Sequence, residues 1–88
     1  MLEKEVTVLN LKGIHARPSA LLVKVANSVK SSVELIKNGQ IANAKSVMSI
    51  MTLGMLYQDK VTIKTNGPDE QEAMEAVSKV FTLIFHDD

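Results

Sequence analysis

The segment Ser32–Asn43, SVELIKNGQIAN, contains two strand-like runs on either side of a two-residue turn. Asn38-Gly39 is the turn, and this dipeptide suits a type I′ geometry because both central residues of that turn need a positive φ angle. Ser32–Lys37 before the turn and Gln40–Asn43 after it are therefore predicted to pair as an antiparallel hairpin.

Two further strands are predicted outside the hairpin. Glu5–Val8 alternates between polar and apolar residues, as a half-buried strand does. Lys60–Thr65 alternates more regularly than any other run in the chain, and the breaker residues at 66–68 end it.

Three helices are predicted to separate or follow these strands. The first begins at or just after His15 and places Pro18 in its first turn, where a missing N–H removes no intrahelical bond. The second spans Ser46–Leu56, and the third begins near Asp69, in a run of acidic residues that suits a helix N-terminus. The first and third helices carry apolar stripes formed by Leu21, Leu22, Val25, Ala26 and Val29, and by Met74, Val77, Val80, Phe81 and Ile84.

The predicted order of elements is therefore β-α-β-β-α-β-α. A mixture of strands and helices with a hairpin in the middle favours a two-layer α+β domain. We expect residues 1–88 to form one domain, in which the helices pack on one face of an antiparallel sheet.

The composition excludes several classes of protein. Ten Lys and Arg residues balance ten Asp and Glu residues, whereas a nucleic-acid-binding protein usually carries a basic excess. Aromatic residues make up only 3% of the chain, too few for a surface that stacks bases. Cysteine is absent, which excludes disulfides, thiol catalysis and thiolate metal sites.

No membrane or export segment is expected. Residues 1–6 become charged immediately and lack the apolar core of a signal peptide. No apolar run approaches the roughly 20 residues that span a bilayer. We therefore expect a cytoplasmic protein without direct membrane insertion.

His15 lies in residues 13–18, GIHARP, and two interpretations of it are open. A histidine beside a helix start is often a capping or partly buried residue. Alternatively, the N–H groups of the helix start and the Arg17 guanidinium would bind an anion, and a neutral imidazole there would attack a phosphoryl group supplied by another protein. A metal site is disfavoured because the only other histidine, His86, lies in the C-terminal tail, and a Ser-His-Asp hydrolase would need a nucleophile elbow.

The second predicted helix is apolar on nearly every side, although a surface helix of a small two-layer domain should have a polar side. Its methionines can fill irregular gaps in a core. An exposed apolar patch is also typical of a docking site, and flexible methionines suit several partners, so we expect a docking surface on part of this helix. The residues concerned are Val47, Met48, Ile50, Met51, Leu53, Met55 and Leu56.

Two motifs resemble those of the HPr family, the histidine-containing phosphocarriers of the bacterial phosphoenolpyruvate-dependent phosphotransferase system. Residues 13–18 resemble the active-site signature of the family, and residues 45–54, KSVMSIMTLG, resemble its second, regulatory signature. The resemblance covers essentially the whole chain. It implies an open-faced β-sandwich, with a four-stranded antiparallel sheet covered on one face by three helices.

The resemblance also implies roles for individual residues. His15 would accept a phosphoryl group on Nδ1 from phosphorylated Enzyme I and pass it to the IIA domain of a sugar permease, while Arg17 would steady the phosphoryl oxygens. The protein would be a monomeric carrier and not an enzyme with its own substrate pocket, and it would need no cofactor or metal. The implied docking surface comprises Ala16, Ala20, Val47, Met48, Met51 and Met55.

Ser46 begins the second predicted helix and is expected to cap it. The resemblance adds regulatory phosphorylation of Ser46 by an ATP-dependent HPr kinase/phosphorylase, with transcription regulators as further partners. A phosphate dianion beside Val47 and Met48 would oppose docking. Two residues depart from the family pattern. Ser49 stands where many members with the regulatory serine have glycine, which weakens the inference about the kinase, and Ser19 replaces the commoner alanine.

Two alternatives to a sugar-transport carrier are open. A paralogue in a nitrogen-type or regulatory branch would use the same chemistry without phosphorylating a permease. A binding module would use the Met-rich helix alone, and its His15 would never be phosphorylated. The sequence does not indicate which sugars a transport carrier would serve.

Overall fold

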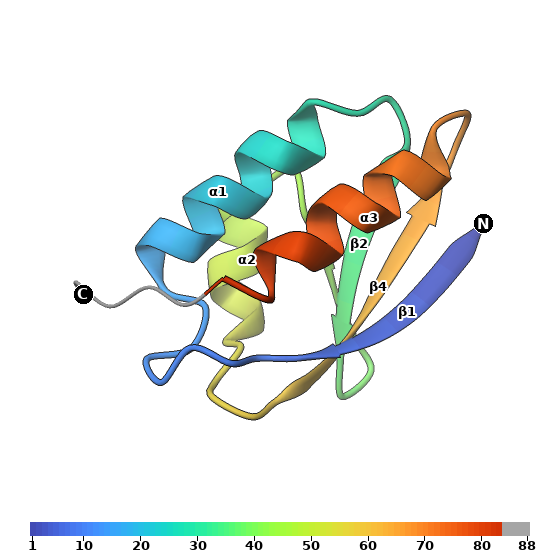
Figure 1. Ribbon diagram of the computed structural model, residues 1–88. Helices are drawn as coiled ribbons and strands as arrows, with labels where there is room; N and C mark the ends of the chain where they lie inside the picture. The colour runs from blue at the N-terminus through green and yellow to red at the C-terminus, as the bar shows by residue number, and fades with distance from the viewer. Residues whose placement is uncertain (84–88) are drawn as a thin grey trace.

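The computed structural model describes residues 1–83 and shows three helices on one side of a four-stranded sheet (Figure 1). All strand pairs are antiparallel, in the spatial order β1-β4-β2-β3. The predicted α+β class and open-faced β-sandwich are therefore confirmed. The elements are β1 (Leu2–Thr7), α1 (Ala16–Asn27), β2 (Ser32–Lys37), β3 (Gln40–Asn43), α2 (Val47–Leu53), β4 (Lys60–Asn66) and α3 (Glu70–Val80).

The hairpin forms between the residues that the sequence predicts. Asn38 and Gly39 both have positive φ angles, 51° and 79°, and Lys37 lies opposite Gln40 in the register. β2 pairs with β4 along its other edge, so the hairpin supplies one central and one edge strand.

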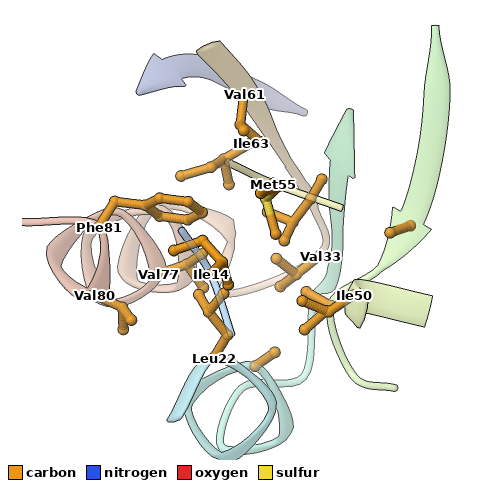
Figure 2. Close-up of a cluster of buried hydrophobic side chains, with 14 of the residues drawn as sticks. Ile14, Leu22, Val33, Ile50, Met55, Val61, Ile63, Val77, Val80 and Phe81 are labelled. Carbon is orange, nitrogen blue, oxygen red and sulfur yellow. The ribbon is translucent and has the colours of Figure 1, made fainter. Parts of the chain in front are cut away.

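The core fills the space between the sheet and the helices. Leu35 of β2 and Ile63 of β4 are opposite one another in the register and are completely buried. Leu22 of α1 and Val77 of α3 are also completely buried, and Figure 2 shows their side chains in the same cluster as Ile63. The predicted apolar stripes are confirmed within residues 1–83, whereas Ile84 and His86 lie outside the described residues.

The first strand begins earlier than its alternation predicts. The register pairs Leu2 with Thr65, so β1 starts at Leu2 and not at Glu5. Pairing with β4 therefore extends the strand through residues that are exposed and carry no alternating apolar signal. Val8, which follows the strand, is completely buried.

The second helix is shorter than predicted. It ends at Leu53 and not at Leu56, because Gly54 adopts a left-handed conformation with φ 66° and ψ 53°. A glycine in this conformation ends many helices, since it lacks the Cβ atom that makes the left-handed region unfavourable for other residues. The chain therefore leaves the helix before Met55.

Candidate functional site

His15 lies at the N-cap position of α1, immediately before the first helical residue. Its backbone is extended, with φ −87° and ψ −159°, and its carbonyl accepts the N–H of Ser19 at 3.0 Å. The imidazole makes no capping hydrogen bond. The interpretation of His15 as a capping side chain is therefore wrong, whereas the alternative of a partly buried residue fits the intermediate exposure of His15.

The first turn of α1, next to His15, carries a positive charge and no negative one. Arg17 is exposed in this turn, and the turn contains no acidic residue. First-turn N–H groups point beyond the end of a helix and form the positive end of its dipole. The structure thus brings His15, Arg17 and a helix N-terminus together, an arrangement that favours a phosphoryl group next to the ring.

The loop before His15 is fixed by the segment that follows α2. The N–H of Ile14 donates to the carbonyl of Met55 at 2.9 Å, and the N–H of Gly13 donates to the carbonyl of Asn10 at 2.9 Å. Gly13 has φ 72°, and a Cβ atom at this position would lie 2.5 Å from the Met55 carbonyl oxygen. Only glycine satisfies both the backbone conformation and the close approach.

Ser19, one of the two departures from the family pattern, is completely buried and does not face solvent. Its Oγ lies 3.3 Å from the carbonyl oxygen of Ile14 and 3.3 Å from Sδ of Met51. The hydroxyl therefore joins α1 to the loop before His15 and to α2. This contact also places Met51 next to the first turns of α1.

The exposed apolar part of α2 consists of Val47, Met48 and Met51, which we call the α2 surface. Their exposed fractions are 43%, 76% and 45%, whereas Ile50 and Leu53 on the other side of the helix are buried. The all-round apolar character of the helix thus has two causes. One side packs on the core, and the other presents an apolar surface beside α1.

Ala16 and Ala20, predicted as docking residues, are exposed on α1. Met55, also predicted as a docking residue, is only 2% exposed and belongs to the core cluster. Figure 2 shows its side chain among Ile63, Val33 and Ile50. The prediction for Met55 is wrong because Gly54 ends the helix and the next side chain turns inward.

Ser46 caps α2, as predicted. Its backbone is extended, and its Oγ accepts the N–H of Ser49 at 3.3 Å. The side chain of Ser49 accepts the N–H of Asn43 at 2.8 Å, so this departure from the family pattern ties the end of β3 to α2.

The residues that sequence reasoning missed lie in the loop between α2 and β4, residues 54–59. The Met55 carbonyl supports the His15 loop, and Lys37 and Asp59 hold the segment around it. Gly54 is the one local signal in the sequence, because a glycine after an apolar helix marks its end. The backbone contact between residues 14 and 55 has no sequence signal of its own.

Two further observations limit the kinds of site present. Within residues 1–83, no three His, Cys, Asp or Glu side chains are grouped so that they could hold a metal ion. In the same residues, no helix has the length and apolar character needed to cross a bilayer.

The comparisons with known proteins agree with this geometry. A family model described as the PTS HPr component phosphorylation site matches residues 2–82. The chain is 44% identical over 77 residues to phosphocarrier protein HPr of Cupriavidus necator, which covers 88% of this chain and 86% of that protein.

Two solved structures illustrate the similarity in fold. HPr of Thermoanaerobacter tengcongensis has a TM-score of 0.90 and 36% identity, and the match covers 93% of this chain and 92% of that chain. Crh of Bacillus subtilis, a catabolite repression protein that forms a domain-swapped dimer, has a TM-score of 0.75 and 40% identity, over 93% of this chain and 94% of that chain. The chain therefore belongs to the HPr family, the phosphocarrier proteins of the phosphotransferase system.

Proposed function

We propose that this protein accepts a phosphoryl group on His15 from phosphorylated Enzyme I in the cytoplasm and passes it to IIA domains of sugar permeases. The observation that carries the proposal is the position of His15. His15 occupies the N-cap position of α1, and Arg17 lies in the adjoining helical turn. This arrangement lies inside the segment that matches the phosphorylation-site model.

The chemistry requires one nitrogen of the ring to react. The lone pair of Nδ1 attacks phosphorus, the bond between phosphorus and Enzyme I breaks, and an N–P bond forms at His15. Nε2 is shielded from solvent, which supports the assignment of the reaction to Nδ1. In the second transfer the N–P bond at His15 breaks, a bond forms between phosphorus and the IIA domain, and Nδ1 recovers its lone pair.

Arg17 and the start of α1 stabilise the charge on the phosphoryl oxygens. A guanidinium offers a planar set of donors that matches phosphate, and charge-assisted bonds of this kind are stronger than neutral ones. The remaining groups of each transfer site come from the partner protein. The protein is therefore a carrier and not an enzyme with its own substrate pocket.

The α2 surface, together with Ala16 and Ala20, is the proposed docking surface for these partners. Its exposed methionines can adapt to different partner surfaces because the side chain is flexible and polarisable. The contact between Ser19 and Met51 places the α2 surface beside α1, which carries Arg17 and directly follows His15.

Ser46 is the proposed site of regulatory phosphorylation by an HPr kinase/phosphorylase. Its side chain is partly exposed and directly precedes the α2 surface. A phosphate group there would place a dianion beside Val47 and Met48 and raise the desolvation penalty of docking. Transcription regulators would be further partners of this state.

The proposal is tested by incubating the protein with Enzyme I and radiolabelled phosphoenolpyruvate. We expect an acid-labile, base-stable label on the wild-type protein and no label on His15→Ala. An unlabelled wild-type protein, or equal labelling of both proteins, would overturn the proposal. The unlabelled outcome would favour a binding module that uses the α2 surface alone.

A regulatory carrier is the second candidate function. The similarity to the catabolite repression protein Crh favours it, because that relative matches almost the whole chain. In both functions Enzyme I phosphorylates His15. Only the transport carrier then passes the phosphoryl group to a IIA domain of a sugar permease. A phosphorylated protein that transfers nothing to any IIA domain would identify the regulatory carrier.

The oligomeric state also needs a direct measurement. We propose a monomer, whereas the Crh structure is a domain-swapped dimer. Light scattering coupled to size-exclusion chromatography distinguishes the two states, and a mass near 9.6 kDa is expected for the monomer.

A further inference from the structure

Lys37, the last residue of β2, contacts both ends of the loop between α2 and β4. Its Nζ lies 2.6 Å from the carbonyl oxygen of Gly54 and 2.9 Å from Oδ2 of Asp59. The Lys37 side chain is only 17% exposed, and that of Asp59 is 29% exposed. One ammonium group therefore closes the loop by binding its first and last residues.

Asp59 extends this network to the middle of the loop. Its Oδ2 also accepts the N–H of Leu56 at 2.7 Å, and its own N–H donates to the Leu56 carbonyl at 3.0 Å. The hydrogen bond from Lys37 is the largest cause that lowers the pKa of the Asp59 carboxyl, followed by the bond from Leu56. Gly54 and Leu56, the two neighbours of Met55, are thus both held by the ion pair.

Met55 transmits this constraint to the loop before His15. Its carbonyl accepts the N–H of Ile14 at 2.9 Å, and the side chains of both residues are buried in the core (Figure 2). The absence of a Cβ atom on Gly13 lets the two segments approach closely. A displacement of the Met55 carbonyl would therefore move the backbone from which His15 projects.

We propose that Lys37 and Asp59 are positioning residues for His15, because their ion pair fixes the Met55 carbonyl and thereby the entry of the chain into α1. This inference rests on the proposed phosphoryl transfer at His15. Neither residue touches the phosphoryl group. Their effect on transfer is geometric, since a misplacement of about 1 Å at a reacting group lowers rates by up to roughly 100-fold.

Three variants separate positioning from a general effect of charge. Lys37→Met removes the ammonium and keeps an unbranched apolar side chain, while Lys37→Arg keeps a cation able to reach the same acceptors. Lys64→Met is the matched control. Lys64 lies in β4 opposite Glu3 and Glu34, and neither of these partners belongs to residues 54–59.

The first measurement is amide hydrogen exchange by NMR, which reports the Ile14–Met55 bond directly. The reference is the N–H of Ala44, which donates to the Val33 carbonyl at 2.9 Å. In Lys37→Met we expect the protection of Ile14 to fall about tenfold relative to Ala44. Lys37→Arg should restore the protection, and Lys64→Met should leave it unchanged.

The second measurement is rapid-quench transfer from phosphorylated Enzyme I. We expect the rate constant at saturation to fall about tenfold in Lys37→Met, with KM within about twofold of wild type, because the α2 surface is unaltered. Lys37→Arg should recover the rate constant. A change confined to KM would assign Lys37 to docking and contradict positioning.

If Lys37→Met does not fold, a second substitution tests the same ion pair. Asp59→Asn keeps an acceptor for the Leu56 N–H and removes the charge that holds Lys37, so it should change Ile14 protection and the rate constant in the same direction. Unchanged protection and unchanged rates in both variants would overturn the proposal. An unlabelled wild-type protein would instead refute the carrier function, and the exchange measurement would still decide the coupling of the loops.

Discussion

The N–H of Ile14 donates to the carbonyl of Met55 at 2.9 Å, and this bond joins the loop before His15 to the loop after α2. The two residues are far apart in sequence, and both are buried. The position of the reactive ring therefore depends on a segment that carries no reactive group.

Gly13→Ala should lower the free energy of unfolding by about 1–3 kcal/mol or more, because the residue has φ 72° and its new Cβ would meet the Met55 carbonyl oxygen. Gly39→Ala is the matched control, since Gly39 has φ 79° with no heavy atom within 4 Å of the added Cβ. We expect the control to lose only about 1 kcal/mol. Urea denaturation measures both losses, and equal losses would contradict the steric role of the Met55 carbonyl.

Met48→Asp should slow transfer from Enzyme I without unfolding the protein, because Met48 is 76% exposed on the α2 surface. Met55→Asp should unfold it, because a buried charge without a partner is strongly unfavourable. Circular dichroism and transfer kinetics on the two variants check this contrast. A folded Met48→Asp protein with the wild-type KM for Enzyme I would remove Met48 from the docking surface.

Ser46→Ala should lower the free energy of unfolding by about 0.5–2 kcal/mol, because it removes the side-chain oxygen that accepts the Ser49 N–H. Ser46→Asp keeps a capping carboxylate and adds a negative charge beside the α2 surface. It should retain most of the stability and raise the KM for Enzyme I. If Ser46→Asp lost as much stability as Ser46→Ala, the capping interpretation would be contradicted.

Stability should fall in acid as Asp69 is protonated. The pKa of its carboxyl is lowered from 3.8 to about 2, first by the hydrogen bond from the Ser31 hydroxyl and next by the bond from the Lys30 N–H. Because the folded-state pKa is the lower one, the contribution is complete above about pH 3.8 and is lost as the pH falls toward 2. The urea midpoint of the wild-type protein should decrease as the pH falls through this range, and the midpoint of Asp69→Asn should decrease less. An equal decrease in both proteins would contradict the assignment of this stability loss to Asp69.

The sequence predicts most of the fold because its strongest signals are local. Asn38-Gly39 identifies the hairpin, and the spacing of Leu22 and Ala26 identifies the buried face of α1. The ends of strands and helices are harder to predict from the sequence when strand pairing or a single backbone angle determines them. β1 extends to Leu2 through its register with β4, and α2 ends where Gly54 becomes left-handed.

In the candidate site, too, residues marked by a local motif are predictable, and residues positioned by tertiary contacts are not. His15 and Arg17 are recognisable because their motif and the helix start are contiguous in sequence. The inward turn of Met55 is not predictable from composition, since a methionine after an apolar helix is equally compatible with a surface or a core position. The contacts of Lys37 with Gly54 and Asp59 depend on tertiary packing, which brings the end of β2 to the loop after α2.

The central claim is that His15 relays a phosphoryl group between two proteins, and a pulse-chase experiment tests it most directly. The protein is labelled through Enzyme I and radiolabelled phosphoenolpyruvate, freed of both, and mixed with a IIA domain. We expect the label to leave His15 and appear on the IIA domain, and His15→Ala to carry no label at either stage. Label that reaches the IIA domain equally well through His15→Ala would contradict it.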